Sequence, residues 1–293
     1  MQPMFLLAIL ALFPLFPTQG FGQTLPTLPQ ATLDTTMPPI TGNTYEVNAG
    51  ENLQAAINLA ATNNPNLNHL IVLQAGASFP GPFTLPPRTG GTGWIILQSS
   101  AVGSLPLQGR RVKPSDSSNM PKIVVDARSG GAIQTASGTH HFRFIGIEIK
   151  PLGGVSICNL VELGTGEKSE GILPHDIVFD RCCLHGDTAR GTRRGVAMNA
   201  ARVAVIDSCL SAFWEVDADS QAIAVWNGPG PFKIVNNYLE GAGQNVMFGG
   251  ADPAISGLVP SDIEIRQNYF VKPLRGKAGN PGPGRGGNRG TGA

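Results

Sequence analysis

One short pattern of apolar positions is repeated five times between residues 142 and 270. Each copy alternates apolar or β-branched residues with polar ones and ends beside Gly, Asn or Asp. The copies are separated by 36, 26, 29 and 31 residues when the following positions are aligned: Ile147, Cys183, Cys209, Tyr238 and Tyr269. Self-similarity at this period is typical of an array, and no helical periodicity lies between the copies. The copies are therefore predicted to be strands of successive coils.

A second family of strands precedes the first at a nearly fixed offset, in the segments 160–163, 196–199, 223–226 and 246–248. Coils with two or more strands bury their apolar faces by stacking at roughly 4.8 Å. The predicted fold is all-β, a right-handed parallel β-helix over about residues 66–272. The register places these residues in one column: Gly146, Cys182, Ser208, Asn237 and Asn268. The last two are expected to form an Asn ladder.

The segment 51–61 is the one convincing helix in the sequence. Its apolar residues Leu53, Ala56, Ile57 and Ala60 fall on one face. Because it comes immediately before the first expected strand, at 70–73, we predict that it caps the N-terminal end of the solenoid. Further early strands are expected at 83–85, 94–97 and 123–125, and the stretch 102–121 is expected to project as a loop.

The two ends of the chain differ in composition from its middle. Residues 1–22 have an apolar run and a small-residue ending that indicate a secretory signal peptide, with a short membrane anchor as the alternative. A Thr/Pro-rich linker (23–43), the β-helix domain (44–274) and a disordered Gly/Pro/Arg tail (275–293) are expected to follow. The last coil has no capping element after it, which predicts self-association through its strand edge or a longer natural protein.

The order of these segments resembles a known family. A signal peptide, a helix beginning Asn52-Leu53-Gln54, a strand Ile71-Val72-Leu73 and repeated coils are similar to the secreted bacterial right-handed parallel β-helix proteins of the pectate-lyase-like superfamily, over roughly residues 44–272. The resemblance implies a secreted or periplasmic protein. Members include lyases, hydrolases, epimerases and binding proteins, so it predicts a fold and leaves the reaction open.

Charge and cysteine content limit the functions further. Lys and Arg number 21 against 20 Asp and Glu, and no basic field for nucleic acid is present. Cys183 and Cys209 share a column within bridging range, but stacked side chains point the same way, which favours reduced, packed cysteines over a disulfide. The pair His140-His141 lacks further metal ligands in the sequence, and turn residues at a coil corner are the alternative.

Loops inserted at one point of successive coils are expected to stand side by side and form a groove wall. The loops 185–194, 211–221 and 240–245 follow the aligned strands and are basic, acidic and amide-rich respectively. The candidate substrate-binding residues in and beside them are His185, Arg190, Trp214, Trp226, Glu240 and Asn245. Trp226 ends a strand, where a packed core residue is the alternative to a flat face for a sugar ring.

Acidic sugars are the substrates that such loops suit. β-Elimination from a uronate needs its carboxylate neutralised, by Arg or by Ca²⁺ on Asp and Glu oxygens, so that a base can remove the C5 proton. Arg193 and Arg194 are the candidates for the first role. Asp217 and Asp219 are the candidates for the second, as calcium ligands. The alternative is that these charges form surface ion pairs worth under about 1 kcal/mol each.

Three functions therefore stay open from the sequence. The first is a polysaccharide lyase or related uronate enzyme, the second a carbohydrate-binding β-helix without catalysis, and the third a structural surface solenoid. Hydrolysis ranks below elimination, because a hydrolase needs paired carboxylates across the bond and Asp217 with Asp219 are the only close pair in these loops. A long groove lined with charges would favour the first reading.

Overall fold

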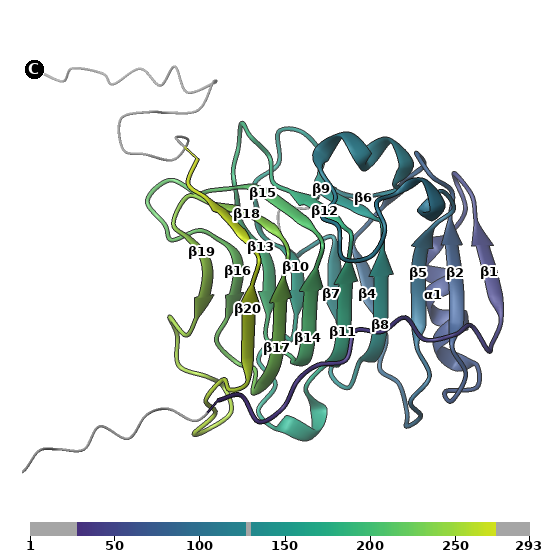
Figure 1. The fold of residues 1–293 in the computed structure, drawn as a ribbon, viewed down its shortest axis with the longest axis horizontal. Helices are drawn as coiled ribbons and strands as arrows, with labels where there is room; N and C mark the ends of the chain where they lie inside the picture. Colours follow the sequence, from purple (N-terminus) through teal and green to yellow (C-terminus); the bar gives the residue numbers. More distant parts are fainter. Residues whose placement is uncertain (1–27, 127–129, 274–293) are drawn as a thin grey trace, which may run out of the picture.

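The computed structural model describes residues 28–126 and 130–273, and its strands form three parallel sheets (Figure 1). Sheet A consists of β1 (Thr44–Val47), β2 (His69–Leu73), β5 (Ile95–Ser99), β8 (His140–Ile145), β11 (His175–Asp180), β14 (Ala201–Ile206), β17 (Gly230–Val235) and β20 (Ile263–Arg266). Sheet B consists of β3 (Ser78–Pro80), β6 (Lys122–Val125), β9 (Glu148–Pro151), β12 (Cys183–His185), β15 (Cys209–Phe213), β18 (Tyr238–Gly241) and β21 (Tyr269–Val271). Sheet C consists of β4 (Phe83–Leu85), β7 (Ile133–Thr135), β10 (Ile157–Leu163), β13 (Thr192–Met198), β16 (Gln221–Val225) and β19 (Gln244–Phe248).

Each coil passes through sheets A, B and C in turn and then joins the next coil. The strands of sheet A rise at the front in Figure 1, those of sheet B cross the top, and the chain returns through sheet C while the coils advance from β1 towards β20. This path is right-handed, and the prediction of a right-handed parallel β-helix is confirmed.

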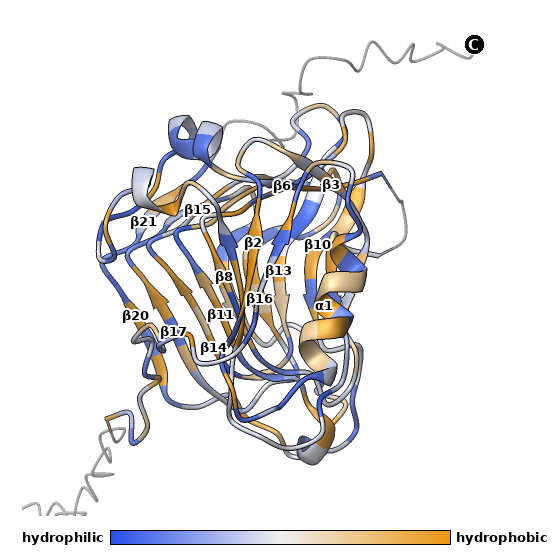
Figure 2. Cartoon of the chain, turned by 90° about the vertical axis from the view of Figure 1, so that its right-hand side faces the viewer, coloured by the Kyte–Doolittle hydropathy of each residue, from blue (hydrophilic) through white to orange (hydrophobic). Residues whose placement is uncertain are grey.

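Apolar side chains from all three sheets fill the interior of the solenoid, and the strands that carry them contain the orange, hydrophobic positions of Figure 2. The rings of Phe144 and Phe179, on neighbouring strands of sheet A, stack with centroids 4.9 Å apart. At the corner between sheets A and B, the Asn237 side-chain amide donates to Asn268 Oδ1 at 3.1 Å, and the Asn237 backbone N–H donates to the same oxygen at 2.8 Å. The predicted Asn ladder is confirmed, and it satisfies backbone and side-chain groups that the turn would otherwise bury unpaired.

Helix α1 (Leu53–Thr62) closes the N-terminal end of the coil stack, as predicted (Figure 2). Asn52 caps it, because the Asn52 side-chain oxygen accepts a hydrogen bond from the Ala55 backbone N–H at 3.0 Å. Leu53, Ile57 and Ala60 are buried in the main core. The predicted order of elements needs one correction. Strand β1 comes before the helix and pairs in parallel with β2, so the helix lies between the first two strands of sheet A.

The register of one coil also differs from the prediction. Cys183 pairs with Glu148, and Leu184 pairs with Ile149, so the first interval is one residue shorter than the alignment of Ile147 with Cys183 implied. Strand side chains alternate between the two faces, and a slip of one residue therefore exchanges them. Ile149 and Leu184 point into the core, which leaves Glu148 and Cys183 on the outer face of sheet B.

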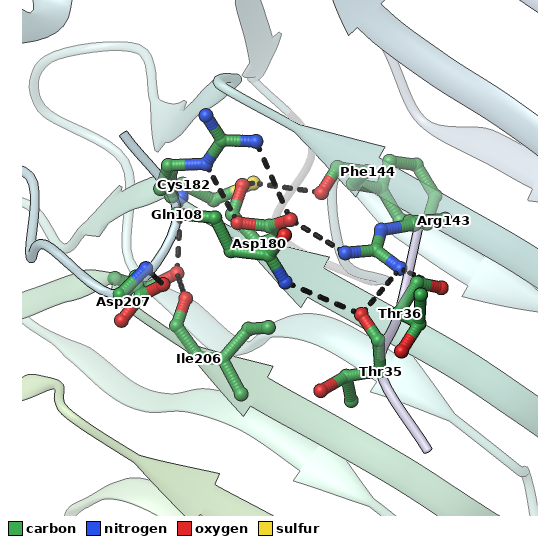
Figure 3. A network of polar contacts seen from close by, with 12 residues as sticks. Thr35, Thr36, Gln108, Arg143, Phe144, Asp180, Cys182, Ile206 and Asp207 are labelled. Carbon is green, nitrogen blue, oxygen red and sulfur yellow. Dashed lines mark hydrogen bonds and ion pairs between the residues drawn. The ribbon is translucent and has the colours of Figure 1, made fainter. Parts of the chain in front are cut away.

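Two segments without strands are packed on the outside of the solenoid. Residues 28–43 cross the outer face of sheet A, where the Arg143 guanidinium donates to the Thr35 carbonyl at 2.9 Å (Figure 3). The stretch 102–121 was expected to project; it instead runs along the corner between sheets A and B. It contains the 3-10 helices η1 (Val102–Ser104) and η2 (Pro114–Asn119), and the Val112 N–H donates to the Asp207 carbonyl at 2.9 Å. A third 3-10 helix, η3 (Glu170–Ile172), follows strand β10 of sheet C in the chain.

The predicted signal peptide and most of the predicted tail lie outside the described residues, and the domain boundaries stay predictions. Within the described ranges, no helix is long and apolar enough to cross a membrane.

On the last coil Ile265, Tyr269 and Phe270 are exposed to 42%, 60% and 50%. These exposures agree with an uncovered strand edge, and self-association through it stays a prediction.

Candidate functional site

The outer face of sheet B carries two rows of side chains that run along the solenoid axis. Strand pairing sets the first row throughout: Lys122, Glu148, Cys183, Cys209 and Tyr238. The second row is Val124, Lys150, His185, Ser211 and Glu240. In it the pairs Val124–Lys150 and His185–Ser211 are in register, and a register shift begins after Leu210. Adjacent coils are about 4.8 Å apart, so each row extends for about 19 Å.

The segment 102–120 forms a wall beside these rows. Its apolar residues Leu105, Val112 and Met120 pack on Cys183 and Cys209 in a small core separate from the main one. It is held in place at the corner between sheets A and B, where the Arg111 guanidinium donates to the carbonyls of Asn236 and Gln267 at 3.1 and 2.8 Å. The wall therefore spans several coils and leaves part of the sheet B face open.

Three adjoining cavities lie along the outer face of sheet B, two of them beside this wall and the third beside the loops that lead from sheet B to sheet C. A cavity of about 240 Å³ is lined by Glu148, His185 and Ser211, among others, and shares His185 with one of about 520 Å³ and Ser211 with one of about 580 Å³. The largest extends to Tyr238 and Glu240. The shared lining residues make a groove along the solenoid axis, across the coils of β9, β12, β15 and β18. We call it the sheet B groove.

A charged cluster lies on the floor of the sheet B groove. Glu148 accepts a hydrogen bond from His185 Nε2 at 2.8 Å, and the ammonium groups of Lys122 and Lys150 each lie 3.3 Å from a Glu148 oxygen. Burial alone would raise the pKa of Glu148, but the His185 hydrogen bond and the charges of Lys150 and Lys122 outweigh it and lower the pKa to about 2. Glu148 is therefore ionised at neutral pH.

The ionised Glu148 determines which nitrogen of His185 carries a proton. A carboxylate only accepts hydrogen bonds, so Nε2 of His185 must be the donor and Nδ1 keeps a lone pair when the ring is neutral. The His185 side chain is 37% exposed and lines two of the cavities. A histidine oriented by a carboxylate and open to a groove has the geometry of a general base.

Tyr238 and Glu240 form a second polar pair in the groove. The Tyr238 hydroxyl donates to Glu240 Oε2 at 2.8 Å. Burial, together with this hydrogen bond and the Glu240 charge, raises the pKa of Tyr238 to about 12, so the phenol stays protonated. The rings of Tyr238 and Tyr269 lie 5.8 Å apart on neighbouring coils, which continues an aromatic surface toward the last coil.

Of the residues predicted from the sequence, His185 and Glu240 lie in the sheet B groove, and Arg194 and Trp226 lie together elsewhere. The Arg194 guanidinium is 5.1 Å from the Trp226 ring centroid and donates to Gln221 and Asn159, which flank it on sheet C. Burial, followed by the neighbouring charge of Arg193, lowers the pKa of Arg194. The predicted residues are thus divided between the outer face of sheet B and that of sheet C.

The predicted basic and acidic loops do meet, and among the described residues the ion pair between them is formed by Arg193. The Arg193 Nε donates to the Asp219 backbone carbonyl at 2.9 Å and lies 3.6 Å from a Glu215 carboxylate oxygen. Asp217 and Asp219 are exposed. Across the described ranges, the one group of three metal-ligating side chains gathered within 4.8 Å is His141, His175 and Asp176. A calcium site at Asp217 and Asp219 has no third side-chain ligand of this kind and stays a prediction.

Three other predicted residues have structural contacts. Trp214 is only 6% exposed and its indole N–H donates to the Asp187 carbonyl at 3.2 Å, so it packs between the loops, and its role in substrate binding stays a prediction. Asn245 donates to the carbonyls of Leu239 and Val271 and joins two coils. Arg190 is exposed, and its backbone N–H donates to Asp187 in the loop after β12.

The cysteines are free thiols, as the sequence favoured. Cys183 and Cys209 pair in register and lie under the wall segment. A hydrogen bond to Cys209 and burial raise the pKa of Cys183, which keeps its thiol protonated. Cys182 points into the main core, where burial raises its pKa to about 12.

Sequence reasoning missed Glu148, Lys122 and Lys150. The alignment of Ile147 with Cys183 put Ile149 beside His185, which hid the charged neighbours. The signal was present in the first strands of the repeat, since residues 142–145 and 177–180 are 35 residues apart, and the same interval pairs Glu148 with Cys183. Lys150 then falls beside His185.

Comparisons with known proteins add a likeness in fold only. No family model and no curated protein matches the chain. Among solved structures, the alginate lyase from Paenibacillus sp. str. FPU-7 is similar over 78% of this chain and 74% of that chain, with 14% sequence identity and a TM-score of 0.37. At that TM-score the likeness carries no argument about the reaction, and membership of the pectate-lyase-like superfamily stays a prediction.

Proposed function

We propose that the protein binds an acidic polysaccharide in the sheet B groove and cleaves it by β-elimination, as a secreted or periplasmic enzyme. The observation that carries this proposal is His185, oriented by Glu148 and placed between the groove cavities beside Lys150. A groove that follows the solenoid axis over four coils suits a linear polymer. Its length, about 14 Å between the first and the fourth coil, matches a few sugar units.

The charges of the cluster favour an anionic ligand. Lys122 and Lys150 contribute two positive charges and Glu148 one negative charge, so the cluster is net positive while His185 is neutral. A uronate carboxylate beside Lys150 is neutralised, which makes the C5 proton more acidic. His185 Nδ1 takes that proton, the C–H electron pair forms the C4–C5 double bond as the C4–O4 bond breaks, and water protonates the departing oxygen.

The test is incubation with pectate, alginate and glycosaminoglycans, with and without Ca²⁺, followed by the ultraviolet absorbance of the conjugated product. His185→Asn should lower turnover by about 10²–10⁴-fold, the usual contribution of a general base, and leave substrate affinity within a few fold. Lys150→Gln should weaken binding. Arg193→Ala, outside the groove, is the matched control and should change neither. Full turnover in His185→Asn would overturn the catalytic role.

A second candidate function is carbohydrate binding without cleavage. It is favoured by the aromatic column of Tyr238 and Tyr269, whose rings lie 5.8 Å apart, and by the 60% exposure of Tyr269. Such rings present flat faces to sugars. In this case no double bond appears with any polymer, Tyr269→Ala weakens binding, and His185→Asn leaves it unchanged.

A further inference from the structure

Three potential metal ligands meet at the corner where sheet C leads into sheet A. His141 follows the first residue of β8, and His175 and Asp176 begin β11. His141 and Asp176 both have left-handed backbone conformations, with φ of 57° and 54°. Such angles are uncommon for residues other than glycine. The pairs on either side of them, His140 with His175 and Phe142 with Ile177, keep the strand register, so the two left-handed residues stack at the same corner.

The ligand atoms of these side chains are as close as a bound ion requires. His175 Nδ1 lies 2.6 Å from Asp176 Oδ2, His141 Nε2 lies 3.9 Å from the same oxygen, and all three atoms fall within 4.8 Å of one another. A tetrahedral ion with bonds of about 2.0–2.2 Å holds its ligand atoms about 3.3–3.6 Å apart. The observed separations of 2.6 and 3.9 Å lie on either side of that spacing.

Hydrogen bonding gives independent support for a cation here. His175 Nδ1 lies 2.6 Å from the Asp176 carboxylate, which needs a proton on the nitrogen, and 2.8 Å from Arg202 Nη2, which needs a lone pair on it. One nitrogen cannot satisfy both partners. A metal ion resolves the conflict, because it uses the lone pairs of Nδ1 and Oδ2 together. Arg202 then keeps its 2.9 Å hydrogen bond from Nε to Asp176 Oδ1.

Each ligand is also held by a neighbour of the kind that supports metal sites. His141 Nδ1 lies 2.8 Å from His140 Nδ1, so a proton on the His141 nitrogen is donated to His140 and Nε2 is left free for a metal. The His140 ring is stacked on His175, with centroids 4.9 Å apart and planes 3° apart. Arg202 orients the Asp176 carboxylate through its Nε, which donates to Oδ1.

We propose that His141, His175 and Asp176 bind a divalent transition-metal ion, with Zn²⁺ as the expected occupant. Two imidazoles and one carboxylate suit zinc and its neighbours in the series, whereas calcium and magnesium prefer sites made of oxygens alone. A cavity of about 260 Å³, lined by His175, Arg202 and Glu170 among others, opens beside the cluster. It provides room for a water or an exogenous ligand at the fourth position.

This site is separate from the sheet B groove. The strands of sheet A lie between the two, since His175 begins β11 and the groove residue His185 follows ten positions later on β12. Six residues of extended strand span about 20 Å. Zinc binding at the corner therefore does not depend on the proposed polysaccharide function, and either can fail alone.

The test uses untagged full-length protein stripped with a chelator. Titration with Zn²⁺ should show one equivalent bound and a raised thermal unfolding temperature. Co²⁺ in place of Zn²⁺ should give the visible absorption of a four-coordinate site. His175→Ala and His141→Ala should each lower zinc affinity by more than the roughly 10–100-fold expected for a change in a supporting residue. His140→Gln, which changes a supporting residue, should fall within that range.

His185→Asn is the matched control for adventitious zinc binding to an exposed histidine and should retain the full stoichiometry. Circular dichroism of the zinc-free variants establishes that they are folded, and the chelator-stripped wild type tests the proposal without any substitution. Zinc that neither binds stoichiometrically nor raises the unfolding temperature of the wild type would overturn the site. Equal zinc affinities in wild type, His141→Ala and His175→Ala would overturn the ligand assignment.

Discussion

Two charged clusters lie on the outer faces of neighbouring sheets in the same two coils. They differ mainly in how far other parts of the chain bury them. On sheet A, Arg143 Nη2 donates to Asp180 Oδ2 at 2.6 Å, and these residues are 1% and 0% exposed. On sheet B, Glu148 is paired with His185, whose side chain is 37% exposed. The first cluster is sealed and the second opens onto cavities.

The cover of the sheet A cluster comes from distant parts of the chain (Figure 3). Arg143 also donates to the carbonyls of Thr35 and Thr36 at 2.9 and 3.2 Å, and Gln108 donates to the Thr35 carbonyl at 3.4 Å. Both Nη atoms of Arg143 thereby find acceptors within the protein, and its Nε is buried without a partner. We conclude that the sheet A cluster fixes the segment 28–43 to the solenoid, whereas the sheet B cluster keeps a histidine available to a ligand.

The comparison predicts its largest effect at Arg143. Arg143→Ala leaves the Asp180 carboxylate buried with Arg181 as its remaining partner, and breaking a buried pair from one side typically costs about 3–5 kcal/mol. The free energy of unfolding from chemical denaturation measures the loss, and limited proteolysis should show earlier cleavage within 28–43. Arg143→Lys keeps the charge without the planar guanidinium, so its unfolding free energy should lie between those of the wild type and Arg143→Ala. A loss under about 1 kcal/mol would contradict the distinction between the clusters.

The next largest effect is the pH dependence of the sheet B cluster. The Glu148 pKa is lowered to about 2 in the folded protein, from 4.5 for the free group. The contribution of Glu148 to the free energy of unfolding is therefore complete above about pH 4.5. As the pH falls toward 2, roughly 2–3 kcal/mol of that free energy is lost. Glu148→Gln should flatten the fall in unfolding free energy over this interval. A variant that follows the wild-type curve would show that Glu148 is not the group responsible.

The fold could be predicted from the sequence because each coil repeats one local pattern. Stacking like residues at a fixed spacing buries columns, so the strands around Cys183, Cys209 and Tyr238 were aligned correctly without any knowledge of long-range contacts. The capping helix followed from its apolar face. The one register error, at Ile147, arose where the repeat was aligned by its turn residues rather than by its strands.

The candidate sites could not be predicted as fully, because they depend on which irregular segment covers which face. Nothing local in 102–121 shows that it lies over Cys183 and Cys209, and this wall is what makes the groove. The cluster at the sheet C to sheet A corner needed Asp176 placed beside His141, 35 residues away, through two left-handed turns. The second placement follows from the 35-residue interval between β8 and β11, whereas the position of the wall depends on packing between distant segments, which no periodicity records.

A smaller effect is expected at Tyr238, which tests the polar pair in the groove. Tyr238→Phe removes the hydrogen bond to Glu240 and should lower the unfolding free energy by about 0.5–1.5 kcal/mol. Because the folded pKa of Tyr238 is raised to about 12, the contribution is complete below about pH 10, the pKa of a free tyrosine, and disappears as the pH rises through 12. Denaturation at pH 8 and above measures both. A variant as stable as the wild type at pH 8 would show that Glu240 finds water instead.

The smallest effect is expected at Arg193, which forms the ion pair between the loops 185–194 and 211–221. Its side chain is 31% exposed and that of Glu215 39%, and their 3.6 Å ion pair is open to solvent. Such pairs contribute under about 1 kcal/mol and weaken with salt. Arg193→Ala should therefore change the unfolding free energy by less than that and leave polysaccharide affinity equal to wild type, measured at two salt concentrations. Arg194→Ala, which uncovers the Trp226 ring, serves as the paired variant. If Arg193→Ala weakens binding and Lys150→Gln does not, the ligand lies over the loops between sheets B and C, and the groove assignment is wrong.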